Sequence, residues 1–401
     1  MQLSGRIYVS ADGTYTSLRH RSDAFLRTGA DLLYENPFGR GGGLHFDGEL
    51  NYRRTDVPDR GDEHFAKLRL DRLSYRDGGT RFEPARWEAG RFLQRGLPEL
   101  GVLDGGEWSW RRKSGDDYGF SAGFMPEPDA DFSTGRDFQI AGFYRWIVDP
   151  GKRFALGGGY QKTFHDGSAD RDLVVAKLEY APTNAWNLHA TTWIDYYGSS
   201  DRVKGTSLDL TQAFVLLSRR WNDGSGMNWT YTHQSFPEIE RHEFRPVEDA
   251  QLADDHDDRL ALSGWRMSGE NRLHGRVGGW VDEEDAGLDA DLGVDFSELL
   301  VDRGRTDVTG FVAAGEFSNT WGGQISFGRA LDDGRWDVFY ELSFNNNVGF
   351  DDTVDDILQH RFRASRDIRE LFGWSLSLNA EVRTFDDEGS ASVGLYMQRS
   401  F

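Results

Sequence analysis

The sequence predicts an all-β fold, namely one antiparallel up-and-down β-barrel of about 22 strands, within a range of roughly 18 to 22. Three observations predict it. Segments that alternate apolar and polar residues recur along the chain, clusters of turn residues separate them, and no helical periodicity interrupts them. The composition agrees, because aromatic residues make up 13% of the chain and 48 glycines stand against 10 prolines. Many aromatic strands joined by glycine-containing turns have such a composition.

The first clear strand is residues 43–54, "GLHFDGELNYRR", in which Leu44, Phe46, Leu50 and Tyr52 alternate with polar residues. A strand points successive side chains to opposite faces, so this segment has one apolar and one polar face. The same alternation recurs in residues 136–146, 186–197, 227–234, 335–346 and 373–385. Hairpin-type turn clusters lie at residues 149–152, 181–184, 222–226, 268–271 and 332–335. Residues 82–100 break the alternation and leave one or two strands uncertain.

The connections favour a membrane-spanning barrel over a soluble β-sandwich. Short turns at 149–152 and 181–184 alternate with longer connections at 165–172 and 198–205, and the longest connection is 235–258. Transmembrane barrels have short periplasmic turns and longer outer loops, whereas a sandwich has no reason to show this alternation. We therefore expect short periplasmic turns, longer outer loops and, since no linker divides the chain, one barrel domain over residues 1–401.

Composition and motifs exclude several other classes. No apolar run approaches the roughly 20 residues of a membrane-spanning helix. The net charge of −21 argues against nucleic acid as a partner. The absence of cysteine excludes disulfides, thiolate metal sites and a lipid-modified N-terminal cysteine. Hydrolase and phosphate-loop motifs are missing as well, so we expect no catalytic residues, no cofactor and no enzyme activity.

The C-terminus, "SVGLYMQRSF", alternates Val393, Leu395 and Met397 and ends on Phe401, with Arg399 where an apolar residue is usual. It resembles the recognition strand that outer-membrane barrels present to the barrel-assembly machinery. Together with the alternating connections, it makes the whole chain similar to a porin-like Gram-negative outer-membrane β-barrel. Residues 86–110, "RWEAGRFLQRGLPELGVLDGGEWSW", also resemble a pattern in porin-like and alginate-export-like barrels.

The resemblance implies a location in the cell outer membrane, contact with its lipid and lipopolysaccharide, and Phe401 as the assembly signal. The chain begins "MQLSGRIYVS" without a charged and then apolar leader. Either the protein is cytoplasmic, or a signal peptide has been removed and Met1 replaces it, and the resemblance to outer-membrane barrels favours removal.

The alternation along each strand assigns every second side chain to the lumen, and these side chains are polar and include both acidic and basic groups. The predicted pore-lining residues are His45, Asp47, Glu49, Asn51, Arg53, Lys67, Arg69, Asp71, Asp289, Asp291, Asp295, Glu341, Arg361, Arg363, Glu381 and Arg383. Charges of opposite sign on neighbouring strands can pair, so a purely structural alternative is that these residues hydrate and brace the wall.

Acidic residues also cluster in the expected loops, where dense carboxylates could hold Ca²⁺. The candidate ligands are Asp254, Asp255, Asp351, Asp352 and Asp355. None has the spacing of a calcium-binding helix-loop-helix, so solvated loop charge is the favoured interpretation of the clusters. We therefore assign no metal from the sequence.

Strands of about 9 to 11 residues use somewhat over half of the chain and leave nothing for a plug domain. A barrel of this width without a plug is expected to be open. We therefore expect a conduit for hydrophilic cargo across the outer membrane, either a porin, which needs no partner, or a polymer-export barrel, which needs an inner-membrane synthesis system. A periplasmic partner protein is possible in the second case. One alternative is a sheath around a partner protein that fills the lumen, such as an electron-carrying cytochrome, and another is a soluble or secreted all-β binding protein.

Overall fold

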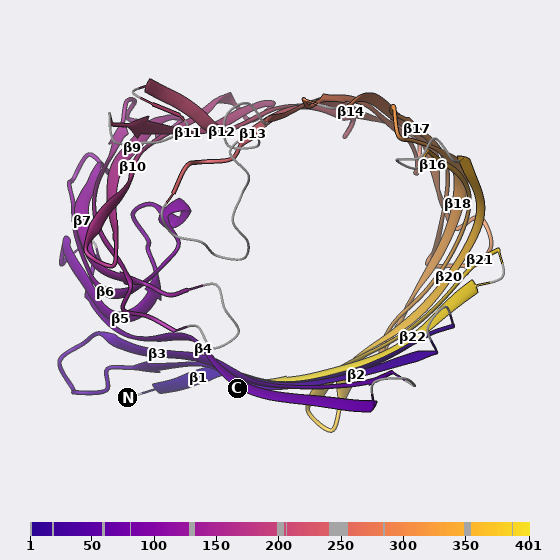
Figure 1. The fold of residues 1–401 in the computed structure, drawn as a ribbon, viewed down its shortest axis with the longest axis horizontal. Coiled ribbons are helices and arrows are strands. Elements are labelled where there is room, and N and C mark those ends of the chain that lie inside the picture. The colour runs from indigo at the N-terminus through magenta and orange to yellow at the C-terminus, as the bar shows by residue number, and fades with distance from the viewer. Residues whose placement is uncertain are drawn as a thin grey trace.

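The computed structural model describes residues 2–17, 20–57, 61–80, 82–127, 133–198, 204–205, 207–239, 256–283, 285–348, 354–386 and 388–401. Within these residues, 22 strands form one antiparallel sheet in which each strand pairs with the next along the chain. β1 (Gln2–Thr16) also pairs with β22 (Glu388–Ser400), and this pairing closes the sheet into a barrel. Figure 1 shows the strands as one oval ring. The predicted up-and-down barrel and its strand number are confirmed.

The other strands follow one another around the ring. Those of the first half are β2 (Arg21–Glu35), β3 (Gly43–Val57), β4 (Gly61–Gly78), β5 (Ala85–Leu93), β6 (Val102–Arg111), β7 (Asp117–Met125), β8 (Asp137–Ile147), β9 (Phe154–His165), β10 (Ser168–Thr183) and β11 (Trp186–Tyr197). Those of the second half are β12 (Ser207–Arg220), β13 (Gly226–Ser235), β14 (His256–Ser268), β15 (Asn271–Val281), β16 (Ala286–Ser297), β17 (Gly304–Ala314), β18 (Ser318–Leu331), β19 (Gly334–Val348), β20 (Val354–Leu371) and β21 (Trp374–Phe385).

The period-two pattern explains why these segments form a single wall with two different faces. In β3, Leu50 is 46% exposed whereas its neighbour Glu49 is only 9% exposed. The same strand exposes Leu44, Phe46 and Tyr52 on the face of Leu50. Within the described residues, no helix is both long and apolar enough to cross a membrane.

The connections at the two ends of the barrel differ in length. The two longest, between β7 and β8 and between β13 and β14, connect strand ends that lie opposite the chain termini. Most connections at the terminal end are shorter, although 298–303 is longer than its neighbours 282–285 and 315–317 at the other end. The predicted alternation therefore holds for the longest connections and not for each pair of neighbours.

One predicted connection is wrong. Residues 165–172 were expected to form a longer loop, but β9 ends at His165 and β10 starts at Ser168. Only Asp166 and Gly167 join the two strands, with φ angles of 47° and 85°. Two-residue hairpin turns require such left-handed conformations, which Gly, Asn and Asp adopt most readily.

The predicted calcium ligands are not brought together by any described part of the barrel. Asp254, Asp255, Asp351 and Asp352 lie outside the described residues. Asp355 belongs to β20, and the structure does not describe its side chain. The Ca²⁺ hypothesis therefore stays a prediction.

Residues 82–100, which broke the alternation, contain β5 and the start of an inward-folded loop. The chain leaves β5 at Leu93, forms the short 3₁₀ helix η1 (Pro98–Leu100) and returns to the wall at Val102. Figure 1 shows the coil of η1 on the inner side of the ring, beside the first half of the wall. We call residues 94–101 the lumen loop.

Candidate pore lining

Hydrogen bonds of the lumen loop identify the inner face of the wall. Ser121 of β7 donates its hydroxyl to Gln94 Oε1 at 2.6 Å. Glu107 of β6 accepts backbone N–H groups of Arg95 at 3.1 Å and Gly96 at 3.2 Å. Residues that pair across adjacent strands share a face, so the strand register extends this inner face from Glu107 around the whole barrel.

The lumen loop also covers an apolar patch on the inner wall. Leu97 and Leu100 are 3% and 5% exposed and form one buried cluster with Ala141, Leu173 and Val175. Phe143 and Trp193 pack against the rim of this cluster. At the loop tip, Lys177 Nζ lies 2.5 Å from Glu99 Oε1. Apolar burial and hydrogen bonds together hold the loop against the wall.

Buried charges lie next to the anchor of the loop. Arg86, which is 4% exposed, donates to Glu107 Oε1 at 2.7 Å and also pairs with Glu88. Glu88 further accepts Arg72 Nη2 at 2.5 Å and Ser74 Oγ at 2.7 Å. A buried charge is costly unless it is paired and hydrogen-bonded, and both carboxylates meet this requirement.

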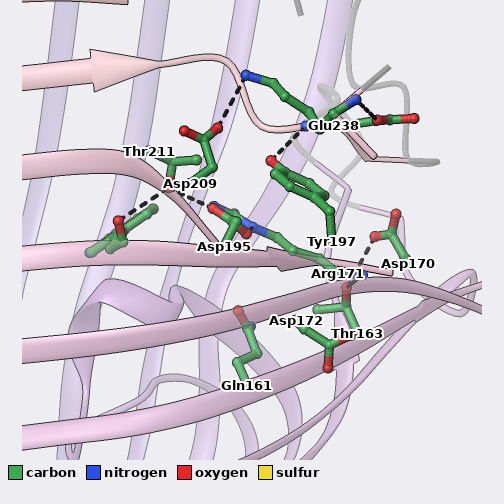
Figure 2. Close-up of polar contacts among 12 residues, drawn as sticks. Gln161, Thr163, Asp170, Arg171, Asp172, Asp195, Tyr197, Asp209, Thr211 and Glu238 are labelled. Atoms are coloured by element: carbon green, nitrogen blue, oxygen red, sulfur yellow. Dashed lines mark hydrogen bonds and ion pairs between the residues drawn. The ribbon is translucent and has the colours of Figure 1, made fainter. Parts of the chain in front are cut away.

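A second segment turns inward after β13. Figure 1 shows the chain leaving β13 toward the inside of the ring, and Figure 2 shows its contacts. The backbone N–H of Glu238 donates to the Tyr197 hydroxyl at 3.1 Å, and Glu238 Oε2 accepts the backbone N–H of Lys204 at 3.0 Å. Lys204 Nζ in turn lies 3.1 Å from Asp209.

The wall beneath this segment is braced by a buried carboxylate. Asp195, which is 0% exposed, accepts two bonds from the Arg171 guanidinium at 2.5 and 2.8 Å and one from Thr211 at 2.5 Å (Figure 2). The two inward segments therefore lie against the same half of the ring, which the Arg171–Asp195 pair reinforces.

The register places the predicted pore-lining residues of β3, together with Lys67 and Arg69 of β4, on the inner face, as it does those of the later strands. It does not place Asp71, which is the extra residue of a bulge in β4. Glu49 lies opposite Arg69, and its carboxylate accepts Asn51 Nδ2 and the Tyr8 hydroxyl, each at 2.9 Å. Arg69 donates to Asp71 at 2.6 Å. His45, Asp47, Arg53 and Lys67 belong to the same face by register.

The later strands bring most of the other predicted residues into ion pairs. Asp289 pairs with Arg276 at 2.7 Å, and Asp295 pairs with both Arg272 and Arg305 at 2.8 Å. Glu381 accepts Arg361 at 2.9 Å and also Arg383, while Arg363 lies over the ring of Phe339. Asp291 and Glu341 differ, because neither has a hydrogen bond or ion pair with a side chain in the described part of the barrel. That these sixteen residues line a pore stays a prediction.

His274, Asp295 and Asp307 are one group whose geometry approaches that of a metal site, since their possible ligand atoms lie within 4.8 Å of one another. However, His274 Nε2 already bonds Asp307 at 2.7 Å, and Asp295 is held by two guanidinium groups. The positive charge of Arg272 and Arg305 opposes a bound cation, so we assign no metal here.

Sequence reasoning missed the lumen loop and the apolar patch beneath it. The loss of alternation, together with Gly96, Pro98 and Gly101, marks a segment that leaves the sheet. Alternation alone does not say whether that segment turns into the lumen or away from it. Once the segment leaves the sheet, the leucines at 97 and 100 need an apolar partner, and the inner wall supplies it.

No protein-family model matches the chain, and no curated protein does. Among solved structures, the P pilus usher (PapC) translocation pore matches with a TM-score of 0.53 and 10% identity, over 98% of this chain and 99% of that one. A second structure of the usher PapC pore matches with a TM-score of 0.50 and 8% identity, over the full length of both chains. Pseudomonas aeruginosa OccK7 (OpdD) matches with a TM-score of 0.48 and 11% identity, over 100% of this chain and 98% of that one. At such identities, the likeness to the usher pores shows the fold alone, and at that level the predicted resemblance to outer-membrane β-barrels is confirmed.

Proposed function

We propose that this chain forms a water-filled channel for hydrophilic cargo across the outer membrane of a Gram-negative bacterium. The observation that carries the proposal is a closed wall with mainly apolar side chains outside and mainly polar, largely ion-paired side chains inside. In a bilayer, only helices and closed barrels satisfy all of their backbone hydrogen-bonding groups. A barrel with this distribution of side chains is suited to lipid on its outer face and to water on its inner face.

The proposed pore is lined by the predicted residues of β3, β4, β16 and β19–β21 and is narrowed by the lumen loop. Ion pairs such as Asp289–Arg276 and Arg361–Glu381 offset much of the charge within the wall itself. Because opposite charges lie side by side, their fields cancel over short distances, and we expect only weak selectivity between cations and anions.

The proposal also includes contact with lipid and lipopolysaccharide and assembly by the barrel-assembly machinery. Phe401 and Gly5 exchange two backbone hydrogen bonds of 3.0 Å, which fixes the end of the chain beside the seam between β1 and β22. The Phe401 side chain is 53% exposed. Its exposure supports the predicted role as an assembly signal.

Proteoliposome swelling tests the proposal. Vesicles that contain the refolded protein should swell in iso-osmotic solutions of neutral solutes, and the rate should fall as the solute becomes larger. Vesicles with heat-denatured protein provide the control. Equal rates in both preparations would contradict a channel.

The sheath alternative makes a different prediction for protein from native membranes. A barrel that normally surrounds another protein should co-purify with it in constant proportion and should conduct only after that partner is removed. A barrel that is purified alone and conducts directly supports the channel.

A further inference from the structure

The inner face of β15–β20 contains a hollow of about 510 Å³, within the range of roughly 300 to 1,000 Å³ that small-molecule sites occupy. The apolar ring of Phe311 lies among polar side chains there. The described residues that line the hollow include no lysine or arginine. Asp291 and Glu341 of this lining are among the predicted pore-lining residues, but the sequence alone does not show that they share a hollow with Phe311.

The strand register arranges the lining in rows across neighbouring strands. One row runs Asp291, Phe311, Gly322, Ser343 and Gln359 on β16 to β20. Thr309, Gln324 and Glu341 occupy the adjacent row. Hydroxyl, amide and carboxylate groups therefore surround the ring on several sides.

Gly322 allows the Phe311 ring to lie over the wall. A Cβ atom at position 322 would come within 2.8 Å of Phe311 Cζ, so the ring covers the place where another residue would carry its side chain. A ring in this position lies along the sheet. It provides an apolar surface at the centre of the polar hollow.

Four polar side chains around the ring are available to a ligand. Within the described chain, Asp291, Gln324, Glu341 and Gln359 make no hydrogen bond or ion pair with another side chain. The two amides both donate and accept hydrogen bonds, whereas the two carboxylates only accept. Elsewhere on this wall carboxylates pair with arginine, as in Arg276–Asp289 and Arg361–Glu381.

The charges around the hollow disfavour an anionic ligand and reduce the attraction for a cationic one. Its lining contains two carboxylates and no cationic Lys or Arg side chain. Just beyond it, Arg276 lies opposite Asp291, and Arg361 lies opposite Glu341. These guanidinium groups offset the negative potential while they remain paired with other acids.

We propose that this hollow binds a neutral saccharide as it passes through the channel. A pyranose ring has an apolar C–H face, which would stack on Phe311, and a rim of hydroxyl groups. Those hydroxyls would donate to Asp291 and Glu341 and exchange hydrogen bonds with Gln324 and Gln359. This inference rests on the proposed channel function and assigns its cargo to a chemical class.

Titration calorimetry on the folded, detergent-solubilised protein tests the site, with maltohexaose as the neutral probe. We expect saturable binding that Phe311→Ala weakens about tenfold or more, because truncation of a central aromatic contact has effects of this size. Phe25→Ala is the matched control, since Phe25 of β2 lies on the inner face by register but outside the hollow. It should leave the affinity unchanged.

A second variant keeps the test decisive if Phe311→Ala does not fold. Gln359→Ala removes one amide at the edge of the hollow and should weaken maltohexaose binding severalfold. The inference is overturned if wild-type protein does not bind maltohexaose at millimolar concentration, if both folded variants bind normally, or if spermidine or oligogalacturonate binds more tightly than maltohexaose. Conductance without sugar tests the channel separately, so a barrel that conducts but binds no maltohexaose refutes this inference alone.

Discussion

The faces of single residues were largely predictable because a strand repeats every two residues. Parity and the register give the same face for Asp47, Glu49 and Asn51. Parity fails across a bulge. Asp71 is the extra residue between two paired positions of β4, so Arg72 also lies on the inner face, which counting by two from Arg69 would not predict. Phe311 shows a second limit, since an inward aromatic cannot be distinguished from a lipid-facing one by hydrophobicity.

Arginine at Leu378 tests the outer face. Leu378 is 41% exposed and faces outward by register, whereas its neighbour Ser377 faces inward. We expect Leu378→Arg to lower the free energy of unfolding by about 2 to 4 kcal/mol in lipid, and Ser377→Arg to have little effect. Urea titration of the protein in vesicles, followed by tryptophan fluorescence, measures both. Equal destabilisation by the two variants would contradict the assigned faces.

Glu107 tests the anchor of the lumen loop. Its carboxylate pairs with Arg86 and accepts two backbone N–H groups of the loop. Glu107→Ala leaves a buried guanidinium without this partner, and removal of one member of a buried pair typically costs about 3 to 5 kcal/mol. We expect a lower unfolding midpoint and larger current fluctuations. Glu179→Ala is the control, because the Arg145–Glu179 pair is about half exposed and should contribute about 1 kcal/mol or less.

Among the structural elements, strands were easier to predict than connections. The sequence correctly predicts that the connection after β13 is the longest, whereas it does not identify 126–136 and wrongly predicts a longer loop at 165–172. Asp-Gly at 166–167 allows a tight turn. Beyond it, the Thr163 hydroxyl bridges a bulge in β10 by donating to Asp170 and accepting the backbone N–H of Arg171. The lumen loop was not predictable because its position depends on contacts with strands distant in sequence.

Replacement of the lumen loop by a two-residue turn tests its effect on the channel. Leu93 and Val102 already pair across β5 and β6, so Asn-Gly can join them directly. We expect the single-channel conductance to rise, because the loop no longer narrows the lumen. The barrel should still fold, since every strand remains. An Asn-Gly variant that folds and conducts like the wild type would show that the loop does not limit the flow of ions.

The contribution of the turn between β6 and β7 to stability should depend on pH. Asp116 accepts the backbone N–H of Ile147 at 2.9 Å, and this hydrogen bond lowers the pKa of the Asp116 carboxyl below its usual range. Because the folded pKa lies below the unfolded one, this stabilisation is present above the unfolded pKa of about 4 and is lost as the pH falls through the folded pKa. Asp116→Asn should therefore reduce stability at pH 7 more than at pH 2, as thermal unfolding can measure. The same loss at both pH values would contradict this role of the charge.

At the scale of the whole molecule, the sequence predicted the barrel because most strands carry the same two-faced pattern and the chain is long enough for about 22 of them. Closure between β1 and β22 follows from the same physics, since an open edge would leave backbone groups unpaired. The inner apolar patch and the saccharide-sized hollow were not predictable, because each combines side chains from several strands. The sequence alone does not give the register between those strands.

Single-channel recording in planar bilayers tests the central claim most directly. The purified protein should insert in discrete steps of large conductance, and the reversal potential in a salt gradient should indicate weak selectivity, because Asp289, Asp295 and Glu381 are each paired with arginine. Protein denatured before addition provides the control. Folded protein that inserts without any current would contradict a water-filled channel, and a strongly cation-selective or anion-selective current would contradict the proposed balance of charge along its wall.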